Sequence, residues 1–331
     1  MKTFRTVFPA QRAPFALTHA NRLLLSGSCF TEHIGARLAS GKFTTLVNPN
    51  GIVYNPVSIA RSLASIAGEN AGAEEAVFKH NGLWHSWEHH GAFSKPGEQE
   101  TLDGIRKARQ EAADYLEKTN YILLTLGTAD VFTLRETGRV VANCHKAPAN
   151  WFVQRRLSVA ETVHALREVL TFIKTRLPEM QVILTVSPVR HLRGGFVENQ
   201  RSKAVLVLAC AELCEQFDFI HYFPAYELLL DDLRDYRFYA ADMIHPNEQA
   251  IDYIWQFFSE MYFTAETRAL LEQIGKVITA ARHRPFNPDT EEHRAFAKAQ
   301  LEQIAELERR GFPINFEEER AIFNQQLNTL R

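Results

Sequence analysis

The 331-residue chain contains few cysteines, no excess of either charge and no long apolar run. Four scattered cysteines cannot form a disulfide framework in a chain of this length, so we expect reduced thiols. With 37 basic and 39 acidic residues, the chain has no global field that would attract nucleic acid or an anionic membrane. No apolar run approaches the roughly 20 residues of a membrane span, and residues 1–9 lack the apolar stretch of a secretory signal. These absences predict a cytoplasmic protein without a nucleic-acid or membrane partner.

The composition is that of an ordinary folded protein, with 46% hydrophobic and 23% charged residues. At this length we expect one large domain with an appendage, or two domains. After Phe263 the chain becomes rich in Glu, Gln, Arg and Ala and is broken by prolines. We therefore predict a large domain over residues 1–263 and a helical C-terminal extension over residues 264–331. Its two or three helices are candidates to cover the core, to shield an active-site mouth or to form a homo-oligomer.

Short apolar runs alternate with helical patterns along the large domain. The predicted strands are residues 22–26, 43–47, 121–126, 181–186 and 219–222. The clearest helix pattern follows Ser158, which forms a capping box with Glu161 and precedes apolar residues at spacings of three and four. Residues from about 67 to 100 lack a clear period, and we interpret them as an insertion. The alternation predicts an α/β fold with a mainly parallel sheet covered on both faces, whose sites lie at the carboxyl ends of the strands.

Ser28 directly follows the first predicted strand, at the point where a helix begins. This position places its hydroxyl at the carboxyl edge of the sheet, among the free backbone N–H groups of a helix start. Such a place suits a nucleophile. A serine before a helix is nevertheless more often an N-cap, so Ser28 alone is weak evidence for catalysis.

Asp242 and His245 lie three residues apart in one loop near the end of the large domain. A nucleophilic serine needs a histidine that takes its proton and a carboxylate that holds the other imidazole nitrogen. Asp242 and His245 can meet that need locally. Without Ser28, we would interpret Asp242 as a turn cap and His245 as the residue before a helix-starting proline.

Several ordered motifs make the pattern more specific. They are Gly-Ser-Cys-Phe at 27–30, Asn-Pro-Asn-Gly-Ile-Val-Tyr-Asn-Pro at 48–56, and further strings at 125–129, 143–146, 185–191 and 235–239. From about residue 24 to 258 the chain resembles the GSCFA family, within the SGNH or GDSL-type hydrolases. The resemblance implies a three-layer α/β/α flavodoxin-like fold with a central parallel sheet. It also implies Ser28 as nucleophile, His245 as general base and Asp242 as the carboxylate that orients it.

The same resemblance implies an oxyanion hole. Its expected donors are the N–H groups of Ser28 and Gly51 and an asparagine side chain after the third strand. The block there normally reads Gly-x-Asn-Asp, but this chain has Gly127 followed by Thr, Ala129 and Asp, so the amide is missing. Asn143 and Asn55 are the candidates to replace it. A smaller departure is Thr31 in place of the alanine that ends the GSCFA signature.

Two further segments contain candidate site residues. Arg190 and His191 follow the fourth predicted strand, where they could bind an anionic or hydroxylated group; a surface salt bridge explains Arg190 equally well. Residues 85–89 fit the zinc pattern H-x-x-E-H, but flanking glycines leave room for only about two helical turns and no third ligand stands out. We therefore expect no metal and no organic cofactor.

The predicted activity is that of a serine esterase of SGNH type acting on carboxylic esters. A small-molecule or carbohydrate ester is the expected substrate, and the resemblance favours O-acetyl groups on a carbohydrate. Two alternatives stay open: an acyltransferase with the same three residues, in which a sugar or alcohol replaces water, and a non-catalytic binding member of the fold. Neither the acyl chain nor the acceptor is defined by the sequence.

Overall fold

The structure is a computed structural model, and it describes residues 6–69, 76–283, 286 and 290–328. The chain divides into two compact units. The first comprises residues 1–10, 23–35 and 45–257, and the second comprises residues 11–22, 36–44 and 258–331. The domain boundary expected at residue 263 stays a prediction, since two N-terminal segments group with the second unit.

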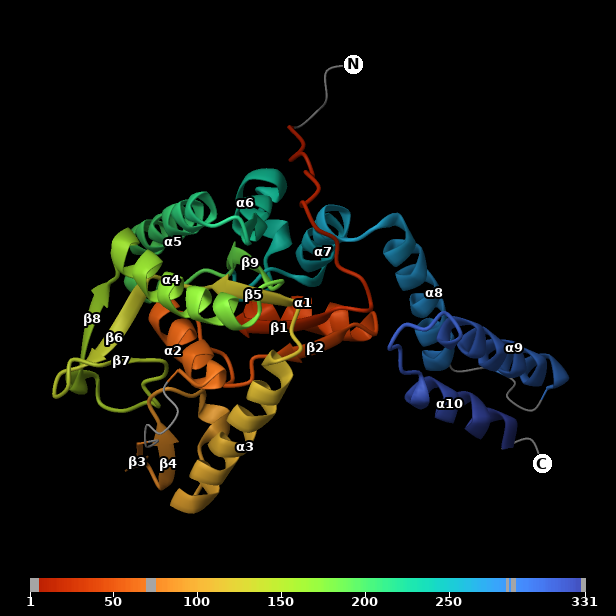
Figure 1. Cartoon of the computed structure of the whole chain (residues 1–331), viewed down its shortest axis with the longest axis horizontal. Helices are drawn as coiled ribbons and strands as arrows, with labels where there is room; N and C mark the ends of the chain where they lie inside the picture. Colours follow the sequence, from red (N-terminus) through yellow and green to blue (C-terminus); the bar gives the residue numbers. More distant parts are fainter. Residues whose placement is uncertain (1–5, 70–75, 284–285, 287–289, 329–331) are drawn as a thin grey trace. The chain divides into compact units, whose positions relative to one another are not determined.

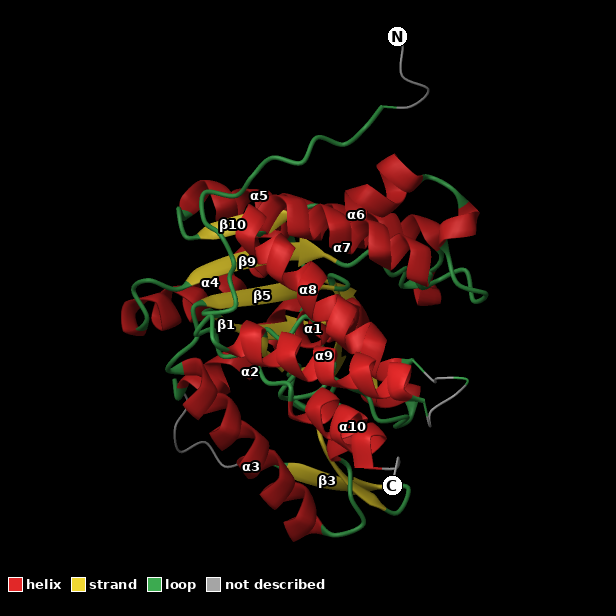
Figure 2. Ribbon diagram, turned by 90° about the vertical axis from the view of Figure 1, so that its right-hand side faces the viewer, coloured by secondary structure: helices red, strands yellow, loops and turns green. Residues whose placement is uncertain are grey.

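A five-stranded parallel sheet forms the centre of the first unit (Figure 2). Its strands in spatial order are β10 (Ile220–Phe223), β9 (Gln181–Val186), β5 (Tyr121–Leu126), β1 (Arg22–Gly27) and β2 (Thr44–Val47). Every residue of β5 is buried, and its neighbours β1 and β9 pair with it in parallel. Strands buried on both faces read as continuous apolar runs, which is why the sequence predicts them.

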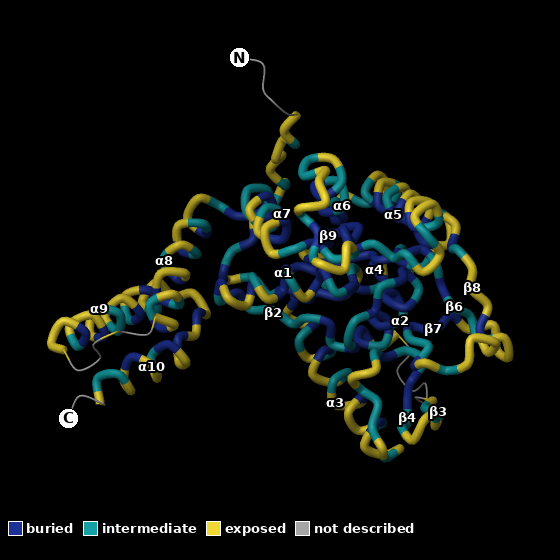
Figure 3. The backbone as a smooth tube through the Cα atoms, turned by 180° about the vertical axis from the view of Figure 1, so that it is seen from behind, coloured by how far each residue is buried: buried dark blue, intermediate teal, exposed yellow. Residues whose placement is uncertain are grey.

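Helices cover the sheet and connect its strands. They are α1 (Cys29–Ser40), α2 (Pro56–Ala67), α3 (Glu98–Leu116), α4 (Val159–Arg176), α5 (Phe196–Gln216), α6 (Ala225–Glu227) and α7 (Glu248–Tyr262). Leu24, Ile122 and Leu184 belong to one core cluster with buried residues of α2, α4 and α5. Leu23 and Leu123 alternate with them, point to the opposite face, and are also buried. The predicted α/β fold with a helix-flanked central parallel sheet is confirmed, and β9, like its neighbour β5, is almost entirely buried (Figure 3).

The first unit also contains antiparallel strands that the sequence pattern does not predict. A hairpin of β3 (Val77–His80) and β4 (Leu83–Ser86) lies within the expected insertion, of which residues 70–75 fall outside the described part. A second sheet has the order β7 (Val140–Val141), β6 (Asp130–Leu134) and β8 (Phe152–Arg156). Short 3-10 turns lie at Gly91–Phe93, Ala149–Trp151 and Leu192–Gly194, and a π-helical turn lies at Leu228–Leu233. A further 3-10 turn, Tyr236–Phe238, precedes the Asp242 loop.

The second unit is mainly helical, as Figure 1 shows in blue. Its helices α8 (Ala265–Arg282), α9 (Glu291–Glu308) and α10 (Glu317–Asn328) share a core that includes Ile274, Ile304 and Phe323. N-terminal residues complete this unit, since Lys42 forms an ion pair of 2.8 Å with Glu319. Across the described residues, no helix is both long and apolar enough to span a membrane.

Candidate active site

Ser28 stands between the end of β1 and the start of α1. Its side chain is buried, with 1% of its surface exposed, and its Oγ has no hydrogen-bond partner among the described residues. Its N–H donates to the carbonyl of Thr125 at 3.1 Å, and its carbonyl accepts from the N–H of Thr31 at 2.9 Å. Gly27, just before it, has φ of +149°, and a Cβ there would lie 2.3 Å from the Thr125 carbonyl oxygen. Only glycine therefore fits before the serine.

Asp242 and His245 form a hydrogen-bonded pair in the loop before α7. The Nδ1 of His245 lies 2.6 Å from the Oδ2 of Asp242. The other carboxylate oxygen accepts the N–H groups of Ile244 at 2.9 Å and His245 at 3.0 Å. The backbone bond from His245 is the largest of the contacts that lower the pKa of Asp242 to about 2. An ionised Asp242 assigns the imidazole proton to Nδ1, which leaves Nε2 as an acceptor.

Arg190 ties this loop to the end of β9. Its N–H donates to the carbonyl of Ile244 at 3.2 Å, and its guanidinium donates to the carbonyl of Met243 at 3.1 Å. The guanidinium also stacks 3.9 Å from the centre of the Tyr239 ring. Arg190 thus contacts the His245 loop through both its backbone and its side chain.

Ser28 and His245 are not hydrogen-bonded to each other. Because the Oγ of Ser28 has no partner in the described part of the chain, the proton path from serine to histidine is not closed. Catalytic hydrogen bonds often tighten only when substrate binds, so this gap does not by itself remove His245 as the base.

The two expected backbone donors of the oxyanion hole are both engaged. The N–H of Ser28 binds Thr125, and the N–H of Gly51 donates to the carbonyl of Asn48 at 2.7 Å. Gly51 has φ of +74°, and a Cβ at this position would lie 2.3 Å from the Cβ of His90. Glycine is therefore required for the turn whether or not its N–H contacts a substrate.

The two asparagines expected to replace the missing amide hold local turns. Asn55 caps α2: its Oδ1 accepts the N–H of Ser58 and its Nδ2 donates to the hydroxyl of Ser58, each at 2.9 Å. Asn143 accepts the N–H of His145 through its Oδ1 at 2.8 Å. Ala129 is fully buried. These bonds give Asn55 and Asn143 structural roles, and their catalytic roles stay predictions.

Gly127 and His191 lie side by side at the ends of β5 and β9. A Cβ at Gly127 would lie 2.8 Å from the Cβ of Tyr54 and 3.0 Å from the Nε2 of His191. That Nε2 is buried and has no hydrogen-bond partner within the described residues. Burial is the main cause that lowers the pKa of His191 to about 3, so its imidazole is neutral.

Lys203 of α5 is a buried residue of this edge that the sequence pattern does not identify as a site residue. Its Nζ donates to the carbonyl of Gly127 at 2.7 Å and to that of Ser187 at 2.6 Å. Burial lowers its pKa to about 7. The helical spacing of residues 203, 206, 210 and 213, which share one buried face, is the sequence signal for its burial. Lys203 thereby holds together the ends of β5 and β9.

The H-x-x-E-H segment does not form a helix. His85 lies in β4, where its Nδ1 is 2.7 Å from the hydroxyl of Ser94 and its Nε2 is 3.0 Å from the carbonyl of His80. His89 lies in the following turn, with its Nδ1 2.8 Å from the hydroxyl of Ser86. The two histidines therefore do not share a helix face, which the zinc pattern requires.

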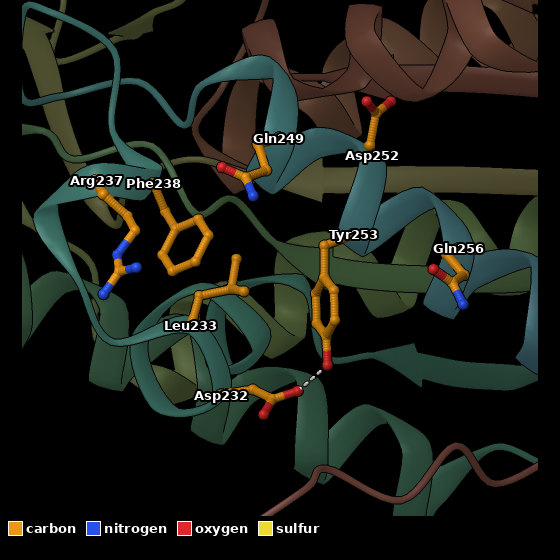
Figure 4. A pocket seen from close by; sticks show the side chains of 8 residues that line it. All are labelled: Asp232, Leu233, Arg237, Phe238, Gln249, Asp252, Tyr253 and Gln256. Atoms are coloured by element: carbon orange, nitrogen blue, oxygen red, sulfur yellow. Dashed lines mark hydrogen bonds between the residues drawn. The ribbon is translucent and has the colours of Figure 1, made fainter. Parts of the chain in front are cut away.

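A cavity of about 570 Å³ lies between residues 232–238 and the first half of α7 (Figure 4). Its walls are Asp232, Leu233, Arg237, Phe238, Gln249, Asp252, Tyr253 and Gln256. The hydroxyl of Tyr253 donates to the carboxylate of Asp232. Neither Ser28 nor the Asp242–His245 pair lines this cavity. We therefore place the candidate active site at the sheet edge and not in this cavity.

Fold and site define an α/β protein with a serine at the end of its first strand and an aspartate–histidine pair near its last. The model of the GSCFA family matches residues 22–258, and that of the GSCFA domain protein C-terminal domain matches residues 274–329. The chain belongs to the GSCFA family, as the sequence resemblance indicated.

No curated protein matches the chain significantly. Among solved structures, it is similar to the crystal structure of a carbohydrate esterase family 3 from Talaromyces cellulolyticus. The identity is 9%, with 77% of this chain and 99% of that chain covered and a TM-score of 0.36.

Proposed function

We propose that this protein is a serine esterase that hydrolyses carboxylic esters, with Ser28 as nucleophile, His245 as general base and Asp242 as the orienting carboxylate. The observation that carries the proposal is the 2.6 Å contact between the Nδ1 of His245 and the Oδ2 of Asp242. It is supported by the Ser28 hydroxyl at the carboxyl end of β1, where α/β folds place their sites, since this hydroxyl has no partner among the residues that the structure describes.

The reaction follows from the donors and acceptors of these three side chains. The Nε2 of His245 accepts the Ser28 proton as Oγ bonds to the ester carbon, and the carbonyl π electrons move onto oxygen. The C–O bond to the leaving alcohol then breaks, and the imidazolium returns the proton to that alcohol. Water attacks the acyl-serine with His245 again as base, which releases the carboxylic acid and restores Ser28. Asp242 stabilises the imidazolium in both halves.

The burial of Ser28 favours a small acyl group. With 1% of its side chain exposed, a bulky acyl chain would require a large rearrangement, whereas an acetyl group requires little space. O-acetyl groups on a carbohydrate are the substrate class that we propose. Attack on the acyl-serine by a sugar hydroxyl instead of water would make the protein an acyltransferase.

The proposal is tested by fluorophosphonate labelling and by acetate release from p-nitrophenyl acetate and an acetylated xylo-oligosaccharide. We expect labelling and turnover in the wild type, and loss of both in Ser28→Ala. Ser26→Ala is the matched control, because Ser26 is equally buried and lies in β1, two residues before Ser28. Absence of labelling and of turnover in folded wild type would contradict the esterase proposal. Acetyl transfer to added polyols in place of acetate release would indicate the acyltransferase.

A further inference from the structure

Asn48 occupies a rigid position beside the strand that ends at Ser28. It follows β2 directly, its backbone φ is +46°, and its side chain is buried. Its N–H donates to the carbonyl of Leu25 in β1 at 2.8 Å, and its carbonyl accepts the N–H of Gly51 at 2.7 Å. The backbone of Asn48 is therefore fixed at both of its hydrogen-bonding groups.

The side-chain amide of Asn48 is fixed at one end and free at the other. Its Oδ1 accepts the N–H of Gly27 at 2.9 Å, one residue before Ser28. This bond sets the orientation of the amide, and the buried Nδ2 has no acceptor among the described residues. An unsatisfied buried donor costs about 1–3 kcal/mol, and folded proteins keep few of them without a reason. The free donor therefore points to an acceptor that arrives with the substrate.

We propose that the side-chain amide of Asn48 donates a hydrogen bond to the oxyanion that forms when Ser28 attacks an ester. This inference rests on the esterase proposal and deepens it. The asparagine expected after β5 is replaced by the buried Ala129, so the amide donor of the site is unassigned. In the sheet, β1 lies between β5 and β2. Asn48 follows β2, so it supplies a side-chain amide from the side of β1 opposite to β5.

The backbone and asparagine donors that the sequence suggests for the oxyanion hole support the assignment to Asn48. In the structure, the N–H groups of Ser28 and Gly51 bind the carbonyls of Thr125 and Asn48. The Nδ2 of Asn55 donates to Ser58 in the cap of α2. Asn48 is thus an asparagine whose Oδ1 binds next to the nucleophile and whose Nδ2 has no acceptor in the described part of the chain.

The proposed role of the Asn48 amide is to stabilise the negative charge of the oxyanion, and it transfers no proton. When the Oγ of Ser28 bonds to the ester carbon, the carbonyl oxygen gains a negative charge and His245 holds the serine proton. The Nδ2–H of Asn48 stabilises that oxygen until the C–O bond to the leaving alcohol breaks and the carbonyl re-forms. Because the Gly27 bond orients the amide before the reaction, no reorganisation is needed at the transition state.

The test compares Asn48→Asp and Asn48→Gly. Asn48→Asp keeps an oxygen that accepts the Gly27 N–H but has no N–H to donate. Asn48→Gly removes the whole side chain, adds no charge and suits the positive φ. For p-nitrophenyl acetate we expect kcat to fall about a hundredfold or more in both variants, with KM within about threefold of wild type.

Asn81→Asp is the matched control, because Asn81 has φ of +47° in the exposed turn between β3 and β4. It should keep the kcat of wild type. Thermal unfolding checks that each variant is folded, and Asn48→Gly decides the question if Asn48→Asp does not fold. Retention of wild-type kcat in folded Asn48→Gly would overturn the proposal. A loss of kcat in Asn48→Gly together with full kcat in Asn48→Asp would also overturn it, because the role of Asn48 would then be limited to accepting the Gly27 N–H. Wild type without turnover or Ser28 labelling would instead overturn the esterase proposal itself.

Discussion

The carboxylate of Asp242 serves two partners in one loop: its Oδ2 lies 2.6 Å from the Nδ1 of His245, while its Oδ1 accepts the N–H groups of Ile244 and His245. The turn-cap role and the orienting role, which compete when the sequence is considered alone, are both filled by the same side chain. Asp242 builds the loop that presents His245 and also sets the tautomer of its imidazole. Replacing Asp242 with a residue that can still cap the turn should therefore lower kcat without unfolding the loop.

Asp242→Asn should lower kcat by about 10²- to 10⁴-fold with little change in thermal stability. The asparagine Oδ1 can still cap the turn, but an amide cannot stabilise the imidazolium as a carboxylate does. Steady-state kinetics and thermal unfolding check this prediction. Asp235→Asn is the control, because Asp235 also caps a turn, accepting the N–H of Arg237 at 2.8 Å. Equal losses of kcat in the two variants would contradict the role of Asp242.

The low pKa of Asp242 also sets the pH range in which its carboxylate stays ionised. In the folded protein the pKa of Asp242 is about 2, below the ordinary value of 3.8. The stability that ionised Asp242 contributes is therefore fully present above pH 3.8 and is lost as the pH falls through 2. Asp242 therefore remains ionised from neutral pH down to pH 4. Any acid limb of the rate profile between pH 4 and 7, measured as kcat against pH, should therefore not arise from protonation of Asp242.

Arg190→Ala should lower kcat about ten- to a hundredfold and leave KM nearly unchanged, because the guanidinium holds the carbonyl of Met243 and the ring of Tyr239 beside the His245 loop. Arg190→Lys should not restore kcat fully, since an ammonium lacks the planar face that stacks on tyrosine. A rise in KM with kcat preserved would instead identify Arg190 as a contact to substrate, the role that the sequence suggests. Steady-state kinetics on p-nitrophenyl acetate and on an acidic acetylated sugar separates the two roles.

Gly27→Ala should destabilise the fold by at least about 1–3 kcal/mol, because φ of +149° is strained for alanine and its Cβ would overlap the Thr125 carbonyl. Urea unfolding measures this loss. Gly104→Ala provides the contrast: a Cβ there meets no atom within 4 Å, and the site lies inside α3. We expect that change to stabilise the protein by about 0.5–1 kcal/mol. Equal effects of the two substitutions would contradict the packing described around β1.

The centre of the parallel sheet could be predicted from sequence because β1, β5 and β9 are buried on both faces. In β5 every residue from Tyr121 to Leu126 is buried, so the run is continuously apolar. The antiparallel β8 was missed because Phe152–Arg156 is mostly exposed and polar, with three consecutive exposed positions. Such a strand is defined by its partner β6, which no local pattern reveals.

Some residues of the candidate site could likewise be predicted from the sequence, and others could not. Ser28, Asp242 and His245 could be proposed because their chemistry is local or follows from the order of motifs. Asn48 could not be proposed as a donor, because the free state of its Nδ2 depends on its Oδ1 binding Gly27 across two strands. Contacts between segments that are distant in sequence decide which polar groups are satisfied, and these contacts appear only in the folded chain.

Lys203 should make the stability of the protein rise with pH between about 7 and 10. Burial lowers its folded pKa to about 7 from the ordinary 10.5, so over this range the unfolded chain binds a proton that the folded protein does not. Urea unfolding at pH 7 and pH 10 gives the change of unfolding free energy with pH, here called the pH slope, for wild type and for Lys203→Met. The two pH slopes should differ by at most about 1.4 kcal/mol per pH unit. Lys203→Met loses the bonds to Gly127 and Ser187, so it should be less stable at pH 10. Lys107→Met, which alters an exposed lysine, should keep the wild-type slope. A wild-type slope equal to that of Lys203→Met would show that the buried amine keeps its ordinary pKa.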